Sequence, residues 1–210
     1  MPILYIIAAG LTAYLLGSIP SAVWAGRIFH GIDVREHGSG NAGATNVIRV
    51  LGWKTGVPVL IFDMVKGFLA AMLPKLFNLA PEESTMLVNL QIFTGLMAII
   101  GHIFPVFAGF RGGKGVATMF GILLAIHPPV TLLCLGVFLI FFLSTGIVSV
   151  GSMAAGTAFP VLLLTLFNTP SVFFRIFSVL VAVALIVTHR KNIQRLLKGE
   201  EKRLFVKKKV

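Results

Sequence analysis

Charged side chains are scarce in this chain of 210 residues, and acidic ones are the scarcest. Charged residues make up 12% of the sequence and hydrophobic residues 57%, with a mean hydropathy of +0.95. Soluble globular domains carry roughly twice that share of charge, and disordered or collagen-like chains carry far fewer apolar residues. The sequence therefore excludes these classes and predicts an all-α, polytopic integral membrane protein.

Cysteine is nearly absent, and basic residues are missing from the start of the chain. The single cysteine, Cys134, lies in the apolar run TLLCLGVFLIFF. It can form no intramolecular disulfide, and we expect it to be a buried packing residue. No Lys or Arg precedes Arg27, so the apolar N-terminus lacks the basic start of a cleaved signal peptide. We expect it to be retained as the first membrane span.

Apolar runs predict about seven membrane spans. Five or six is the alternative, because several boundaries are soft and the short fourth run could form one broken hairpin with the fifth. We expect the spans to form a single domain over residues 1–210, which ends in a basic interfacial tail at residues 189–210. The predicted spans are residues 3–26, 56–80, 84–103, 115–127, 129–148, 150–168 and 170–188.

Basic residues are in large excess, with 18 Lys and Arg against 7 Asp and Glu and a formal net charge of +11. In a soluble protein this excess would suggest nucleic acid, but in a membrane protein basic loops are retained on the cytoplasmic side and contact anionic lipid. With seven spans and an outside N-terminus, all basic residues except Lys66, Lys75 and Arg175 fall on the inner side. We therefore expect an outside N-terminus, a cytoplasmic C-terminus, contact with membrane lipids and no nucleic-acid partner.

A glycine-rich polar segment, HGSGNAGATNVIRVLG at residues 37–52, follows the first predicted span. Glycines let backbone N–H groups approach an anion closely, and hydroxyl and amide side chains add hydrogen-bond donors. The apolar periodicity from Val47 predicts a helix that begins near Thr45 or Asn46, either of which could cap it. Because Arg49 lies about one turn into that helix, the segment is typical of a phosphate-binding loop; a flexible connecting loop is the alternative.

A second segment, GHIFPVFAGFRGGKGVAT at residues 101–118, sets Arg111 and Lys114 among four glycines just before the fourth predicted span. A guanidinium binds phosphate through two hydrogen bonds, and an ammonium acts as a mobile point charge. The segment is not a nucleotide-binding P-loop, because Ala108 and Gly115 stand where that motif needs glycine and a hydroxyl residue. A topology signal is the alternative, but such a signal needs no glycines.

Two further pairs of polar residues lie near the predicted inner face. Ser149 and Ser152 are placed at the inner turn between the fifth and sixth spans. His189 and Asn192 are three residues apart, so they share one face of the interfacial helix that the amphipathic tail predicts. Both pairs are therefore placed where they could join a site at the membrane surface.

Ionisable residues at the expected depth of the spans have structural explanations. Asp63 and Lys66 are three residues apart inside the second span, where ionisable groups are costly and are expected to pair. His102 ends an apolar run, and we expect it to be a structural residue bonded to a carbonyl group.

The usual signatures of several enzyme classes are missing. No histidine is followed by an aspartate five residues later, as in the common glycerolipid acyltransferases, and there is no GxSxG motif or zinc-ligand set. The residues alone indicate a membrane enzyme that handles phosphate, and no ligand set calls for a metal. If one substrate is an activated acyl donor, binding the substrates in register and stabilising the leaving phosphate could supply most of the catalysis. A carrier for an organic phosphate and a non-catalytic lipid-binding protein stay open as alternatives.

Three segments resemble, in the same order, the signature segments of the bacterial acyl-phosphate:glycerol-3-phosphate acyltransferase family (PlsY). They are GSGNAGATN at 38–46, GHIFPVFAGFRGGKGVAT at 101–118 and HRKNIQRL at 189–196, and GSIPSA at 17–22 and FDMVKG at 62–67 also fit. The resemblance implies transfer of a fatty acyl group from acyl phosphate to the 1-hydroxyl of glycerol 3-phosphate. The products would be lysophosphatidate and phosphate, at the first step of phospholipid synthesis. It further implies a monomer in the bacterial inner membrane with its active site on the cytoplasmic side.

The resemblance also implies roles for individual residues. Arg49, Lys114, Ser149 and His189 are expected to be catalytic, and the hydroxyl proton is expected to leave through His189 or a substrate phosphate oxygen without a covalent acyl-enzyme. Backbone N–H groups of the second segment are expected to hold phosphate. No cofactor or metal ligand is expected. The expected substrate or phosphate contacts are Ser39, Gly40, Asn41, Thr45, Asn46, Arg49, Arg111, Gly112, Gly113, Lys114, Ser152, His189 and Asn192.

Overall fold

The computed structural model describes residues 2–167 and 169–204, and every regular element within these ranges is helical. The all-α prediction is therefore confirmed for the described residues. The α-helices are α1 (Pro2–Ser18), α2 (Ser21–His30), α3 (Ala44–Leu51), α4 (Trp53–Leu76), α5 (Thr85–Ile103), α6 (Val116–Ile126), α7 (Pro128–Thr145), α8 (Val148–Leu166), α9 (Val172–Thr188) and α10 (Arg190–Leu197). Two short 3₁₀ helices, η1 (Val34–Glu36) and η2 (Val106–Ala108), lie in the loops before α3 and α6.

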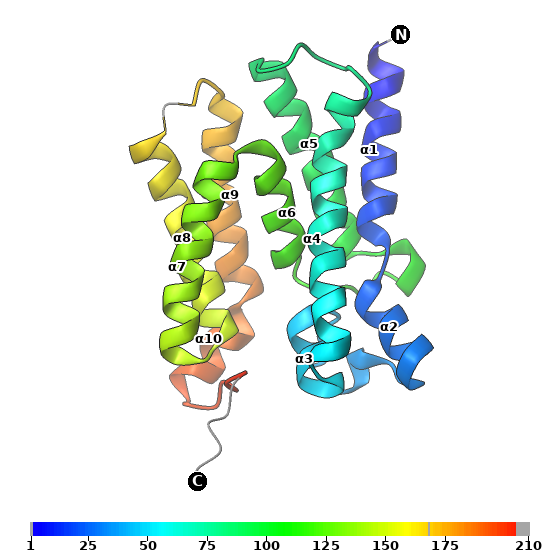
Figure 1. Cartoon of the computed structure of the whole chain (residues 1–210), viewed down its shortest axis with the longest axis vertical. Coiled ribbons are helices and arrows are strands. Elements are labelled where there is room, and N and C mark those ends of the chain that lie inside the picture. The colour runs from blue at the N-terminus through cyan, green and yellow to red at the C-terminus, as the bar shows by residue number, and fades with distance from the viewer. Residues whose placement is uncertain (1, 168, 205–210) are drawn as a thin grey trace. The chain divides into compact units, whose positions relative to one another are not determined.

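The chain divides into two compact units, and the second begins at Pro128. The first unit holds α1 to α6, and the second holds α7 to α10 (Figure 1). The expectation of a single domain over residues 1–210 stays a prediction.

Small residues bring the helices of the first unit close together. Helix α1 packs against α5, and α4 packs against α6. A Cβ atom on Gly17 would overlap the carbonyl group of Ala98, and one on Gly67 would overlap the carbonyl group of Thr118. Glycine at these positions therefore allows the backbones to approach, as is common between membrane helices.

Aromatic side chains fill the interior of the second unit. Helix α8 packs against both α7 and α9. The rings of Phe159 and Phe174 are each 1% exposed and lie with their centroids 6.0 Å apart, tilted by 58°. Cys134 on α7 is buried, as the sequence predicts for a packing residue.

The described helices provide five or six candidate spans rather than seven. Five segments are long and apolar enough to cross a bilayer, and the bent pair of α9 and α10 makes a sixth if it counts as one span. Helix α6, the predicted fourth span, has 11 residues, and at about 1.5 Å per residue it is far shorter than a ~30 Å hydrocarbon core. This count agrees with the lower alternative. The predicted orientation of the termini, which was argued from seven crossings, stays a prediction.

Two predicted span boundaries need correction. The first run is broken at Ile19 and Pro20 into α1 and α2, because proline has no N–H to donate and restricts the residue before it. The turn between α7 and α8 lies at residues 146–147, where Gly146 has φ of 73°. Ser149 therefore lies in the first turn of α8 and not in the connecting turn.

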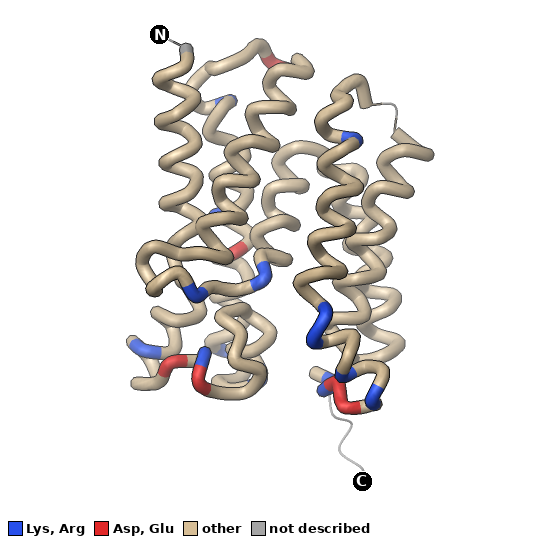
Figure 2. Tube along the Cα trace, turned by 180° about the vertical axis from the view of Figure 1, so that it is seen from behind, with Lys and Arg blue, Asp and Glu red and all other residues tan. Residues whose placement is uncertain are grey.

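Charged residues gather at one end within each unit. In the first unit most of them lie in α2, α3, the start of α4 and the loops beside η1 and η2, and in the second unit most lie in and after α10 (Figure 2). The glycine-rich segments of the first unit belong to the same group of loops.

Candidate active site

The first glycine-rich loop is organised around the side chain of Asn46, which is 1% exposed. Its Oδ1 atom accepts hydrogen bonds from the backbone N–H of Ser39 at 2.8 Å and from the Ser39 hydroxyl at 3.1 Å. Its Nδ2 atom donates to the carbonyl groups of Val34 and His37, at 2.8 and 3.0 Å. The amide therefore ties the two ends of the loop together.

Helix α3 begins one residue earlier than predicted, at Ala44, and Gly43 occupies the N-cap position with no capping side chain. The prediction that Thr45 or Asn46 caps this helix is wrong, because both residues lie inside its first turn and Asn46 bonds back to the preceding loop. The other predicted contacts of the segment lie near the surface. Ser39 and Gly40 are exposed, and Asn41, Thr45 and Arg49 are half-buried.

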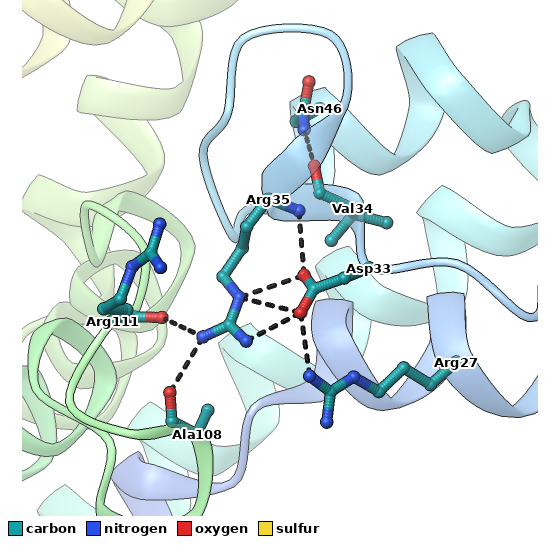
Figure 3. Close-up of polar contacts among 7 residues, drawn as sticks. All are labelled: Arg27, Asp33, Val34, Arg35, Asn46, Ala108 and Arg111. Atoms are coloured by element: carbon teal, nitrogen blue, oxygen red, sulfur yellow. Dashed lines mark hydrogen bonds and ion pairs between the residues drawn. The ribbon is translucent and has the colours of Figure 1, made fainter.

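Arg35 ties the first loop to the second (Figure 3). Its Nη1 atom donates to the carbonyl oxygen of Ala108 at 2.8 Å and to that of Arg111 at 3.1 Å. Its Nε and Nη2 atoms donate to the carboxylate of Asp33, at 2.9 and 2.7 Å. The Arg35 hydrogen bond holds the pKa of the Asp33 carboxyl well below its usual range, although partial burial opposes this shift. Sequence analysis did not single out either residue.

The second glycine-rich loop is held by its own backbone. The N–H of Gly112 donates to the carbonyl of Ile103 at 3.0 Å, and the N–H of Gly113 donates to the carbonyl of His102 at 3.2 Å. These two N–H groups are thus already paired within the protein, which argues against their expected role as phosphate donors. Arg111 is exposed and Lys114 is half-buried.

The glycines of this loop allow it to lie against its neighbours. A Cβ atom on Gly113 would overlap the ring of His102 and would come within 2.9 Å of the carbonyl oxygen of Ala42, which belongs to the first loop. A small cavity of about 10 Å³ lies beside the contact, and Ala42, Lys66, His102 and Gly113 are among the residues that line it. The two predicted phosphate-binding segments therefore meet in the first unit.

A buried polar network lies beneath the meeting point. Lys66 pairs with Asp63 at 2.8 Å, as predicted, and also donates to the carbonyl of Ile19 at 2.9 Å. The Asp63 carboxylate further accepts a hydrogen bond from Ser21 at 2.8 Å. His102 is buried, but its Nδ1 atom lies 3.2 Å from the Thr118 hydroxyl, so the predicted carbonyl partner is wrong.

In the second unit, the polar residues gather around a carboxylate that sequence analysis missed. The hydroxyl of Ser149 donates to Glu201 Oε1 at 2.8 Å, and the amide of Asn192 donates to the same atom at 2.6 Å. Arg195 Nε donates to the other oxygen at 2.5 Å. Burial raises the pKa of Glu201, but these hydrogen bonds outweigh it, so the pKa lies below its usual value. The signal in the sequence that could have identified it is the pair Glu200 and Glu201, the acidic residues of an otherwise basic tail.

His189 joins α9 to α10 and is 3% exposed. Its Nδ1 atom lies 2.8 Å from the carbonyl oxygen of Leu185. Because a carbonyl oxygen can only accept, Nδ1 donates this hydrogen bond and carries a proton. Ser152 is also buried, one turn after Ser149 on α8. Within the described ranges, no three His, Cys, Asp or Glu side chains gather in a way that could hold a metal ion.

These features define a class of protein: an integral membrane enzyme whose basic, glycine-rich loops can bind phosphate at one end of a helical unit. Comparison with known proteins identifies the family. The sequence model of the family described as "Glycerol-3-phosphate acyltransferase" matches residues 7–199.

Two proteins named glycerol-3-phosphate acyltransferase are similar over nearly their whole lengths. The one from Chlorobium phaeobacteroides (strain BS1) is 44% identical, over 91% of this chain and 93% of its own. The one from Chlorobium chlorochromatii (strain CaD3) is 41% identical, over 96% and 97%.

Two crystal structures of PlsY, an integral membrane glycerol 3-phosphate acyltransferase, match the fold. The glycerol 3-phosphate form is 40% identical with a TM-score of 0.81, and it covers 94% of both chains. The lysophosphatidic acid form is 39% identical with a TM-score of 0.77 and the same coverage. The chain therefore belongs to the glycerol-3-phosphate acyltransferase family, which confirms the resemblance and makes the protein a membrane acyltransferase rather than a carrier or a lipid-binding protein.

Proposed function

We propose that this enzyme transfers a fatty acyl group from acyl phosphate to the 1-hydroxyl of glycerol 3-phosphate. The hydroxyl oxygen forms a bond to the acyl carbon, and the bond from that carbon to the phosphate oxygen breaks. The products are 1-acylglycerol 3-phosphate (lysophosphatidate) and inorganic phosphate. The enzyme acts as a monomer in the bacterial inner membrane, with its active site on the cytoplasmic side and without a cofactor.

The observation that carries the proposal is the meeting of two loops of different sequence in the first unit. Arg35, in the 3₁₀ helix η1 just before the first loop, donates to carbonyl groups of the second loop, and Gly113 of the second loop lies against Ala42 of the first. The guanidinium of Arg111 and the ammonium of Lys114 come from the second loop, and Arg49 comes from the helix that follows the first. Three cations on loops that are held together suit a reaction in which both substrates and one product carry phosphate.

The second unit supplies the groups that we assign to the acyl acceptor. We propose that the chain forms one functional domain, in which His189 and Asn192 bind glycerol 3-phosphate and Ser149 contacts a substrate. His189 is the acceptor that we assign to the hydroxyl proton, because histidine is the side chain that most often takes up a proton in general base catalysis. A phosphate oxygen of the substrate is the alternative acceptor.

Release of inorganic phosphate by the purified protein in micelles tests the reaction. Palmitoyl phosphate with glycerol 3-phosphate is expected to give phosphate and lysophosphatidate in equal amounts. Palmitoyl-CoA and palmitoyl-acyl carrier protein are the matched controls and are expected to give no product. Turnover with either thioester and none with acyl phosphate would contradict the assigned donor.

A covalent intermediate offers a separate test of direct transfer. Incubation with radiolabelled palmitoyl phosphate alone, followed by denaturation, is expected to leave no label on the protein. Label that hydroxylamine removes, and that the Ser149→Ala variant lacks, would show an acyl-enzyme on Ser149 and overturn direct transfer.

A further inference from the structure

One guanidinium group connects two segments that are distant along the chain. Arg35 is half-buried, with its side chain 12% exposed. Its Nη1 atom donates hydrogen bonds to the carbonyl groups of Ala108 and Arg111, which are 73 and 76 residues away in the sequence. Its remaining contacts, from Nε and Nη2, go to Asp33. The side chain is therefore directed at the second loop by the carboxylate of Asp33, which precedes the first loop.

The place of Arg35 is fixed from the side of the first loop. Asp33 accepts a backbone hydrogen bond from the N–H of Arg35 at 3.0 Å and caps the 3₁₀ helix η1. Val34 lies between them, and its side chain is fully buried. The carbonyl group of Val34 accepts a hydrogen bond from Asn46. The guanidinium thus sits on a segment that Asn46 also holds in register with the first glycine-rich loop.

The two carbonyl groups that Arg35 binds flank the sharpest part of the second loop. Between Ala108 and Arg111, both Gly109 and Phe110 have positive φ angles, of 63° and 58°. The carbonyl of Arg111 points toward Arg35, while its own side chain leaves in another direction (Figure 3). Fixing this carbonyl fixes the backbone from which the phosphate-binding side chain of Arg111 extends.

We propose that Arg35 is a positioning residue for the acyl transfer: by bridging Asp33 to the carbonyl groups of Ala108 and Arg111, it sets the spacing between the two phosphate-binding loops. This inference rests on the proposed function. Lysine cannot replace arginine here, because an ammonium lacks the planar fork that meets a carboxylate on one edge and two carbonyl groups on another.

Arg27 provides a matched control. It binds the same carboxylate oxygen of Asp33 at 2.9 Å, but its side chain is 60% exposed. Within the described residues it forms no hydrogen bond to the second loop, whereas Arg35 forms two. The Arg27→Ala variant therefore removes one partner of Asp33 and leaves the bridge in place.

Steady-state kinetics with both phosphate substrates test the proposal. Arg35→Lys is expected to raise the KM of one substrate by about tenfold and to change kcat by less than about threefold, because displaced loops weaken binding in the ground state and the transition state alike. Arg27→Ala is expected to leave both KM values unchanged. Unchanged KM values in Arg35→Lys, or the same increase in Arg27→Ala, would overturn the proposal.

A double-mutant cycle distinguishes positioning from general weakening. Arg111→Ala is expected to raise KM much less in the Arg35→Lys background than in the wild type, because Arg111 is already misplaced there. In the Arg27→Ala background its effect is expected to equal that in the wild type. Additive effects of Arg35→Lys and Arg111→Ala would show that Arg35 does not act through Arg111.

Spin labels give a readout that needs no turnover. Cysteines replace Glu36 and Phe107, which are both exposed, in a background where Cys134 is alanine. A narrow distance distribution is expected for the parent and for Arg27→Ala, and a broadened one for Arg35→Ala. An unchanged distance distribution in Arg35→Ala would contradict the positioning role of Arg35, whatever reaction the enzyme catalyses. A wild type without acyltransferase activity, together with a broadened distribution in Arg35→Ala, would instead contradict the proposed function.

Discussion

Replacing Lys66 by methionine is expected to destabilise the protein strongly, because it leaves a carboxylate buried without its partner. The side chains of Lys66 and Asp63 are 3% and 2% exposed, and their charged atoms are 2.8 Å apart. Methionine keeps the length and most of the volume of lysine but donates no hydrogen bond. The variant also loses the hydrogen bond from Nζ to the carbonyl of Ile19, at the break between α1 and α2.

The size of the effect follows from the burial of the pair. Removing one partner of a buried ion pair costs about 3–5 kcal/mol of folding free energy, since the remaining charge is uncompensated. For a chain of this length, each kcal/mol lowers Tm by roughly 2–4 °C. A decrease in Tm of roughly 6–20 °C is therefore expected for Lys66→Met.

Thermal unfolding in detergent micelles measures this decrease, and the chain offers two controls. Lys75 pairs with Glu82 at 3.0 Å, but the two side chains are 46% and 72% exposed, so Lys75→Ala is expected to lower Tm by no more than about 4 °C. The double variant Asp63→Leu/Lys66→Met removes both charges and is expected to recover most of the loss. Equal effects of Lys66→Met and Lys75→Ala would refute the reasoning.

Three further changes test the two units separately. Gly113→Ala is expected to reduce activity at least tenfold and to cost about 1–3 kcal/mol in unfolding free energy, because its Cβ would overlap the ring of His102, whereas Gly136→Ala, which meets nothing within 4 Å on α7, should change neither. Lys114→Ala is expected to lower phosphate release by roughly a hundredfold, measured in micelles, if its ammonium stabilises the leaving phosphate. Glu201 has a lowered pKa, so its contribution to stability is complete above its ordinary value of 4.5 and is lost as pH falls below it. Glu201→Gln should therefore lower Tm at pH 7 and unfold like the wild type under strongly acidic conditions.

Apolar runs predicted most of the helices because the length of a continuous hydrophobic segment can be counted directly from the sequence. The runs at 84–103 and 129–148 correspond closely to α5 and α7. The apolar run did not predict the break at Pro20, because apolar residues continue on both sides of it. Hydropathy does not reveal that proline has no backbone N–H to donate. Helix α6 was counted as a span because its composition is apolar, although its 11 residues are too few for a full crossing.

The candidate site was predictable where side-chain chemistry marks it and not where the backbone supplies the partner. Glycine, Arg111 and Lys114 identify the second loop, and the spacing of Asp63 and Lys66 identifies their pair. The bridge made by Arg35 ends on carbonyl groups 73 and 76 residues away, and any residue has a carbonyl group. The sequence also does not show where the N–H groups of Gly112 and Gly113 point. Their hydrogen bonds to the carbonyl groups of Ile103 and His102, which argue against a role as phosphate donors, appear only in the fold.

The second unit holds two candidates for the proton acceptor of the proposed reaction, Glu201 and His189, and their hydrogen bonds differ. Glu201 is a carboxylate that receives three hydrogen bonds, and its lowered pKa makes it a weak base at neutral pH. It therefore activates Ser149 poorly as a nucleophile, since the serine proton would have to move to an oxygen that is already stabilised as an anion. His189 differs, because it is a histidine whose ring is oriented by the hydrogen bond from Nδ1 to the carbonyl of Leu185. We therefore propose that Ser149 acts as a hydrogen-bond donor, and that His189 or a phosphate oxygen of the substrate receives the hydroxyl proton in a direct transfer.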